Sequence, residues 1–204
     1  MINGDIGYFG LSEWWLNSFS DSERKHIINT YKPLSTGTES LIEGNIDYTS
    51  KTIISFLVGL SGWFNKTEDI QITFKIFEKI ESLIQPNTNI IDLHFFYQQR
   101  LELYYKYRDI YPNALNIAID TCKKQIEISE KVSLAFKKEY KNAPLPRHKG
   151  YEQLAKIEEK NKRYDVVITL CQKALYQKWN GDWQKRIDRN NNKLLKTNNK
   201  SFIV

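Results

Sequence analysis

The chain holds few residues whose types and spacing could do chemistry together. Its three histidines, His26, His94 and His148, lie far apart in the sequence. None belongs to a Glu-x-x-His or His-x-x-x-His pair, which would place two metal ligands on one face of a helix. Because His94 stands among aromatic residues, we expect it to lie at the edge of the core and not to bind a metal ion. The sequence predicts no metal site.

Signatures of covalent catalysis and of phosphate binding are also missing from the sequence. No cysteine or serine stands in a known nucleophile arrangement with histidine. The glycines Gly7 and Gly10 enclose only two aromatic residues, which is too short a stretch to cradle a phosphate before a helix. We therefore expect a protein without a cofactor and without catalytic residues.

Composition narrows the class of protein. Of 204 residues, 41% are hydrophobic and 26% are charged, which is typical of a globular chain. Only 9 glycines and 5 prolines are present, and this scarcity favours long helices over a turn-rich β-sandwich. No apolar run approaches the roughly 18 residues that cross a bilayer, and the start does not resemble a secretory signal. With only Cys122 and Cys171, no disulfide framework is expected, so we predict a cytoplasmic protein outside the membrane.

Hydrophobic periodicity predicts an all-α fold of about eight helices and no strand. Ser20 and Glu23 form a capping box at the start of one helix, and Asn89 opens another. Pro112 suits the first turn of a further helix. The last three helices are expected near residues 148–160, 164–178 and 183–196.

The same pattern predicts how the chain is organised. Residues 1–48 read as an aromatic helical segment followed by the long loop 34–48. Residues 49–142 read as two helical hairpins. The segment Ala143-Pro144-Leu145-Pro146 is the clearest linker, and it introduces a C-terminal hairpin and a basic last helix over 143–204. We expect these parts to form one continuous domain.

A spaced set of small and large apolar residues occurs three times along the chain. The last copy has Leu154-Ala155, then Tyr164, then Val167, Cys171 and Ala174, and closes at Trp179. It resembles the tetratricopeptide repeat, in which a Leu-small pair marks the first helix and a small–large–small set marks the second. Looser echoes are Leu60-Ser61 with Thr73, Phe77 and Ile80, and Ala118 with Cys122 and Gln125.

The resemblance implies antiparallel helical hairpins that stack, because each hairpin leaves a hydrophobic face for its neighbour to cover. Ile80, Gln125 and Ala174 are 45 and 49 residues apart, whereas the family repeats every 34 or so. Either a stretched tetratricopeptide-like solenoid or a more compact α-α bundle fits this spacing. In the family the partner lies along the concave face of the first helices, which in the last copy would carry Lys149, Glu152, Lys156 and Glu159.

Charge is divided unequally along the chain. Residues 1–120 carry a net charge of −5, and residues 121–204 carry +11. In the last helix Lys185, Arg189 and Lys193 recur every three to four residues, and Arg147 belongs to the same basic part. This stripe could engage the phosphates of a nucleic acid through residues 147–196. Alternatively it is the solvated outer face of a capping helix, which repeat arrays require.

Two aromatic features complete the candidate sites. Trp14 and Trp15 are adjacent, so on a helix one of them must point away from any single narrow stripe. Either the helix is clamped between two surfaces, or one tryptophan is an exposed contact for a partner. Tyr104 belongs to a tyrosine-rich helix that could line a small-molecule or enzymatic pocket, or simply pack against the core. We expect a protein- or peptide-binding scaffold, with a nucleic-acid-binding protein and a small-molecule binder or enzyme as alternatives.

Overall fold

The computed structural model describes residues 2–33, 41–141 and 143–201, without the side chains of 197–201. Over these residues the chain forms eleven α-helices, one short 3-10 helix and no β-strand. The expected all-α class is confirmed, but the helices outnumber the eight expected. The surplus includes the five-residue helix α1 (Gly4–Tyr8) and α8 (Ser129–Glu139), which periodicity does not separate from the helix before it. Among the described residues, no helix is both long enough and apolar enough to cross a membrane.

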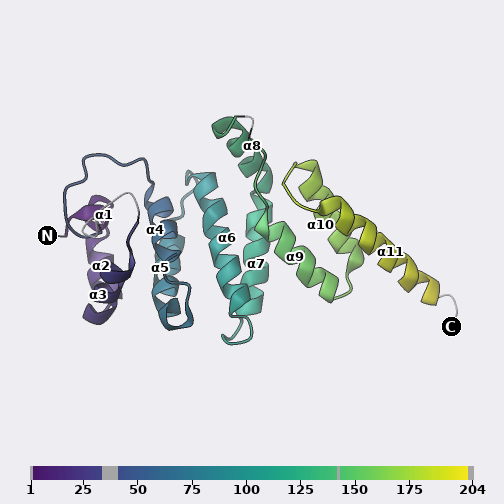
Figure 1. Ribbon diagram of the computed structural model, residues 1–204, viewed down its shortest axis with the longest axis horizontal. Coiled ribbons are helices and arrows are strands. Elements are labelled where there is room, and N and C mark those ends of the chain that lie inside the picture. Colours follow the sequence, from purple (N-terminus) through teal and green to yellow (C-terminus); the bar gives the residue numbers. More distant parts are fainter. Residues whose placement is uncertain (1, 34–40, 142, 202–204) are drawn as a thin grey trace. The chain divides into compact units, whose positions relative to one another are not determined.

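The chain divides into two compact units, Met1–Thr88 and Asn89–Val204. This division falls inside the segment 49–142, which the sequence assigns to two hairpins. Unit 1 contains α1, α2 (Ser12–Ser18), α3 (Asp21–Thr30), α4 (Ile53–Ser61), the 3-10 helix η1 (Thr67–Asp69) and α5 (Ile70–Leu83). Unit 2 contains α6 (Ile90–Lys106), α7 (Ala114–Glu127), α8, α9 (Lys149–Lys160), α10 (Tyr164–Tyr176) and α11 (Trp183–Ser201), all labelled in Figure 1.

In unit 1, local capping signals position the helices. The capping box of α3 is confirmed, because the Ser20 side chain accepts from the Glu23 amide and the Glu23 carboxylate accepts from the Ser20 amide. Residues 41–44 of the predicted loop accept hydrogen bonds from the first turn of α1. The amides of Gly4 and Ile6 donate to the carbonyls of Gly44 and Leu41, respectively. Residues 34–40 of that loop lie outside the described residues.

In unit 2, successive helices form antiparallel hairpins, α6 with α7 and α9 with α10, and α11 packs against α10 (Figure 1). Asn89 caps α6 as expected, since its side chain accepts from the amides of Ile91 and Asp92. Pro112, in contrast, does not begin the next helix. Asn113 has a positive φ of 60°, so the chain turns there and α7 starts at Ala114.

The two hairpins of unit 2 meet where α9 begins. Gly150 lies so close to α7 that an added Cβ would be 2.7 Å from Gln125 Oε1 and 3.0 Å from the Cys122 carbonyl oxygen. A side chain at residue 150 would therefore push α9 away from α7, and glycine permits the close approach. The Gly150 amide donates to Gln125 Oε1 over 2.7 Å, which ties the two helices together.

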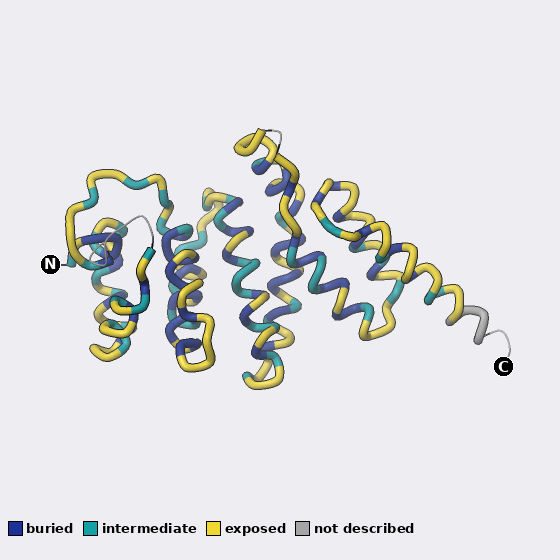
Figure 2. Tube along the Cα trace, in the orientation of Figure 1, coloured by how far each residue is buried: buried dark blue, intermediate teal, exposed yellow. Residues whose placement is uncertain are grey.

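The core of unit 2 is continuous along the inner sides of these helices (Figure 2). The residues that carry the repeat pattern are part of it: Ala155, Val167, Cys171 and Ala174 are fully buried. In the looser copies Ala118, Cys122 and Gln125 are fully buried too, as are Leu60 and Ile80 of unit 1. The small residues of the pattern are thus buried in the core of their units.

Candidate functional site

A groove between α6 and α9 is lined mainly by charged side chains. Leu101 and Glu102 of α6 form one wall, and the other wall comes from α9, with Lys149, Glu152, Gln153 and Lys156. An ion pair spans the groove, with 3.2 Å between Lys149 Nζ and Glu102 Oε1. A second pair, 2.7 Å between Lys156 Nζ and Glu152 Oε1, runs along α9. The groove therefore presents both signs of charge, above the buried Leu101.

Helical periodicity places the α9 residues in this groove. Positions 149, 152, 153 and 156 recur at three- to four-residue intervals and share one face. The opposite face carries Tyr151, Leu154 and Ala155, which are buried in the core. The four residues predicted on the first helix of the last hairpin are thus divided: Lys149, Glu152 and Lys156 line the groove, whereas Glu159 is engaged elsewhere.

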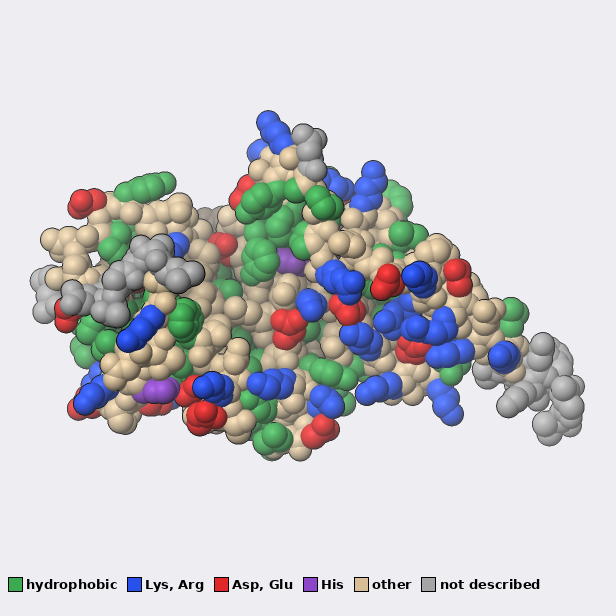
Figure 3. Space-filling model, viewed as in Figure 1, with side chains coloured by type: hydrophobic (Ala, Val, Ile, Leu, Met, Phe, Trp, Pro, Cys, Tyr) green, Lys and Arg blue, Asp and Glu red, His purple; other side chains and the backbone are tan. Residues whose placement is uncertain are grey.

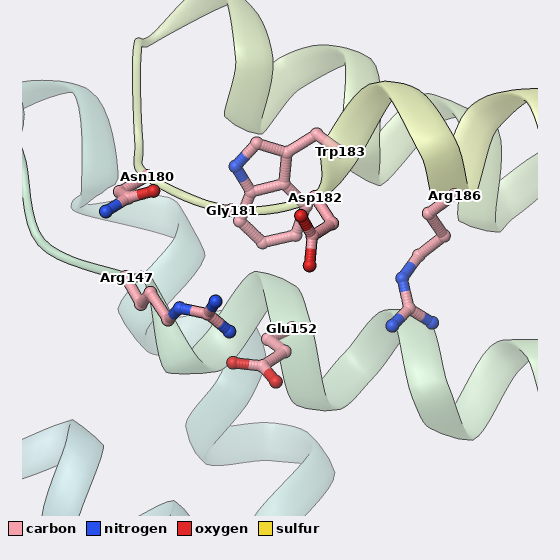
Figure 4. Close-up of a pocket in the computed structure, with 7 residues that line it drawn as sticks. All are labelled: Arg147, Glu152, Asn180, Gly181, Asp182, Trp183 and Arg186. Atoms are coloured by element: carbon pink, nitrogen blue, oxygen red, sulfur yellow. The ribbon is translucent and has the colours of Figure 1, made fainter.

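A small pocket of about 40 Å³ adjoins the groove at Glu152, which lines both (Figure 4). Figure 4 shows Arg147 and Glu152 below the turn that precedes α11, with Asp182 and Trp183 above them and Arg186 to the side. The turn is held in place because the Asn180 amide donates to the Pro146 carbonyl over 3.2 Å. The pocket thus contains two arginines and two carboxylates.

The Glu152 carboxylate is charged at neutral pH. Burial raises its pKa, but the hydrogen bond from Lys156 and the positive charges of Lys156, Lys149 and Arg147 outweigh burial, so the pKa lies below its usual range. Arg147 contributes to this field although it is exposed. Groove and pocket therefore keep a nearly balanced set of charges, and neither resembles a purely cationic phosphate site.

The basic stripe of the last helix is partly neutralised within unit 2. Three cations of α11 surround the Glu159 carboxylate: Arg186 at 2.8 Å, Arg189 at 2.9 Å and Lys193 at 2.7 Å. Lys185 is exposed. Burial raises the pKa of Glu159, but hydrogen bonds from Arg189 and Lys193 dominate and lower it to about 2. The stripe therefore fastens α11 to α9, which favours its interpretation as a capping helix.

We expect Glu159→Gln to destabilise unit 2 by about 2 kcal/mol, between the values for exposed and buried ion pairs. Glu159 and Arg186 are only 15% and 18% exposed, so the substitution leaves a poorly solvated cation without its carboxylate. Because the folded pKa lies below the ordinary 4.5, this contribution is complete above pH 4.5 and disappears as the pH falls towards 2.

Urea denaturation and amide hydrogen exchange test this expectation, with Glu127→Gln, an exposed acid on α7, as the matched control. Protection should fall mainly in α11, which is fastened through Glu159. Unchanged exchange in α11 would show that the carboxylate does not hold this helix.

The sequence does not predict a cluster of buried polar and aromatic residues at the centre of unit 2. His94 from α6 and His148 before α9 are both fully buried, with ring centroids 5.1 Å apart. Trp179 stacks on His94 at 5.4 Å and meets the His148 ring edge-to-face at 4.7 Å. Gln125 joins them, because its amide Nε2 donates to the His94 carbonyl over 2.9 Å. We call His94, Gln125, His148, Tyr151 and Trp179 the histidine cluster.

Hydrogen bonding decides which ring nitrogens in the histidine cluster carry protons. His148 Nδ1 accepts from the Tyr151 amide and so caps α9, which leaves the proton on Nε2. Burial lowers the pKa of His94 to about 4 and that of His148 to about 3, so both rings are neutral at pH 7. Neither Nε2 atom has a hydrogen-bond partner among the described residues. The cluster is therefore sensitive to protonation.

Groups for covalent or metal chemistry do not converge in the described part of the chain. There, no set of three or more His, Cys, Asp or Glu side chains lies close enough to hold a metal ion. Burial raises the pKa of the Cys122 thiol to about 12 and that of Cys171 to about 11, so both thiols stay protonated.

The remaining candidates do not line the groove. Trp15 is 2% exposed and packs on Phe19, so it cannot serve as an exposed contact. Trp14 is partly exposed beside Lys75 and Lys79 of α5. Tyr104 is partly buried, with the Arg100 guanidinium 5.1 Å above its ring. Both tryptophans thus pack on Phe19 in unit 1, whereas Tyr104 belongs to unit 2.

Comparison with known proteins identified no relative of this chain. A scan of protein-family models found no match to this chain, and searches of curated proteins and of solved structures also found none.

Proposed function

We propose that this chain is a tetratricopeptide-like protein-binding module, and that the groove between α6 and α9 holds an extended segment of a partner protein. The observation that carries the proposal is the groove itself, which presents paired charges of both signs. Such a lining offers both donors and acceptors, and a polypeptide carries both kinds of group. A polyanion would meet Glu102 and Glu152 as repulsive neighbours. The tetratricopeptide resemblance supports the same face, because α6 and α9 are the first helices of their hairpins.

Charge reversal across the groove tests the proposal. The full chain would be used for affinity purification from the native host, with nuclease treatment and mass spectrometry. Glu102→Lys and Lys149→Glu should each abolish recovery of a specific protein. The double variant Glu102→Lys/Lys149→Glu restores the ion pair and the fold but reverses the polarity of the groove, so it should also fail to recover that protein. Equal recovery by the double variant and the natural chain would reject the groove.

Net charge favours a second candidate, binding of nucleic acid by the basic part of unit 2. Lys and Arg side chains gather over α9 and α11 on the face shown in Figure 3. If the chain binds nucleic acid, the molecules that are purified with it would be lost after nuclease treatment and at about 200 mM salt. Lys185→Glu/Lys196→Glu is the informative variant, because neither lysine contacts Glu159 in the described structure. It should weaken retention on nucleic acid and leave protein recovery through the groove unchanged.

A further inference from the structure

A second groove lies where α8, the linker before α9 and the turn after α10 meet in unit 2. Its walls come from the last turns of α8, from the linker after α8 and from the turn after α10. The lining residues are Lys137, Ala143, Pro144, Leu145, Lys178 and Asn180, around a space of about 390 Å³. We propose that this groove, here the lysine groove, docks an acidic peptide segment of a partner protein that inserts an apolar side chain.

Uncompensated positive charge is the first observation that supports an acidic occupant. No Asp or Glu is among the lining residues. Lys137 and Lys178 are exposed, and neither forms an ion pair with the described residues. In the α6–α9 groove, by comparison, Lys149 and Lys156 each face a carboxylate. The lysine groove therefore has a positive electrostatic potential, which a carboxylate of the partner would neutralise.

More lysines extend this field. Lys138 and Lys141 lie at the end of α8, and Lys173 lies on α10, all exposed and without an ion pair among the described residues. Glu139 is the one acid in the last turn of α8, and it raises the pKa of the neighbouring Tyr140 hydroxyl. Long-range attraction of an acidic segment would raise its association rate and would weaken with salt.

An apolar floor distinguishes a peptide from a polyphosphate chain. Leu145 is buried under the groove, and Ala143 and Pro144 contribute exposed apolar surface. Large exposed apolar side chains stand beside the lining residues in sequence: Tyr140 is 49% exposed and Tyr176 is 84% exposed. An apolar side chain on the acidic segment would cover this surface, whereas a phosphate backbone would gain nothing from it.

The backbone of Lys178 also indicates a constrained position. Lys178 has a φ of 67°, in the left-handed region where glycine or asparagine is favoured. Its amide donates to the Leu175 carbonyl over 2.9 Å as α10 ends. The fold thus holds a lysine side chain at the mouth of the lysine groove despite the conformational cost.

Fluorescence anisotropy with defined probes tests the lysine groove. The positive probe is a labelled peptide of alternating Glu and Leu, and the controls are peptides of alternating Glu and Ser and of alternating Lys and Leu. Labelled oligouridylate is the fourth probe. We expect the full chain to bind the Glu-Leu peptide more tightly than the other three, and to bind it more weakly as salt increases.

Charge-matched variants then locate the binding. Lys137→Glu/Lys178→Glu should weaken binding of the Glu-Leu peptide at least about tenfold, since two attractions become repulsions. Lys124→Glu/Lys160→Glu carries the same net charge on exposed sites of α7 and α9 and should leave binding unchanged. Circular dichroism confirms that both variants are folded. Equal loss in both variants would overturn the lysine groove, as would preference for the Glu-Ser peptide or for oligouridylate.

The lysine groove shares no residue with the α6–α9 groove, so the two proposals fail separately. Suppose that Lys137→Glu/Lys178→Glu no longer binds the Glu-Leu peptide but still recovers the protein whose recovery depends on Glu102 and Lys149. This result would support two independent docking surfaces.

Discussion

Lowering the pH from 7 to 5 should destabilise unit 2 by about 4 kcal/mol, because two buried histidines resist protonation. Burial lowers the pKa of His94 to about 4, and burial together with the neighbouring His94 lowers that of His148 to about 3. In the unfolded chain both return towards 6.5, so the unfolded state binds more protons below this pH. Stability is therefore complete above pH 6.5 and is lost progressively as the pH falls towards the folded values.

The expected size of this loss follows from the number of protons. Each pH unit below 6.5 costs about 1.4 kcal/mol for each histidine, until its folded pKa is reached. Domains of this size have total stabilities of roughly 5–15 kcal/mol, so the loss at pH 5 should be a substantial fraction of the stability of unit 2. Glu152 and Glu159 also stabilise the folded state, because their pKa values are lowered on folding. This stabilisation is lost only below pH 4.5, so it does not contribute to the change between pH 7 and pH 5.

Urea denaturation between pH 7 and pH 5 measures this dependence. In His94→Phe/His148→Asn, phenylalanine retains a ring beside Trp179, and asparagine retains a side-chain acceptor to cap α9. The double variant should show a much flatter pH profile than the natural chain. His26→Gln, which replaces an exposed histidine of unit 1, should leave the slope of unit 2 unchanged. A profile as steep in the double variant as in the natural chain would assign the acid sensitivity to other groups.

Protonation of His148 would also affect the proposed binding face. Its Nδ1 accepts the Tyr151 amide at the start of α9, and a protonated ring cannot accept this hydrogen bond. Lys149 and Glu152 lie in the first turn of the same helix and line the α6–α9 groove. The folded ring takes up this proton only near pH 3, so the groove should keep its geometry for as long as unit 2 stays folded above that pH.

Local sequence signals predict the helix starts that depend on a few adjacent residues. The capping box at Ser20 and the cap at Asn89 are both confirmed, because each requires only contacts within one helical turn. Pro112 misleads because proline tolerates several turn positions, and the left-handed Asn113 decides where α7 begins. The separation of α8 from α7 at Ile128 is also missed, since apolar periodicity continues across the junction.

Spacing along one helix likewise predicts part of the candidate site. Lys149, Glu152 and Lys156 share a face of α9, which periodicity alone indicates. Their partner Glu102 lies on α6, and no rule of spacing relates it to them. The histidine cluster is missed for the same reason: His94 and His148 are 54 residues apart, and the packing of α9 on α7 at Gly150 brings them together.

Packing also accounts for the long interval between the last two copies of the repeat pattern. Between Gln125 and Ala174 the chain inserts α8 and the linker that returns to α9. The last copy of the pattern closes at Trp179. Its indole reaches the inserted helix, with its centroid 6.2 Å from the Phe136 ring, and also contacts the rings of His94 and His148. Trp179 thus joins the insertion to both hairpins.

Trp179→Ala should therefore destabilise unit 2 by about 3–5 kcal/mol, the range for removal of a buried large aromatic side chain. Trp179 is 2% exposed, and its Nε1 donates to Gln177 Oε1 over 2.9 Å, so the substitution opens a cavity and leaves an acceptor with one partner fewer. Trp179→Phe, which keeps a ring but loses the donor, should cost about 1–2 kcal/mol.

Urea denaturation followed by far-ultraviolet circular dichroism distinguishes these cases without relying on tryptophan fluorescence. Trp63→Ala, at a 41% exposed site in unit 1, should cost no more than about 1 kcal/mol. If Trp179→Ala cost no more than this control, the indole would not connect α8 with the hairpins. A cost that matched the prediction would show that the contacts of Trp179 with Phe136 of α8 and with the rings of His94 and His148 stabilise unit 2.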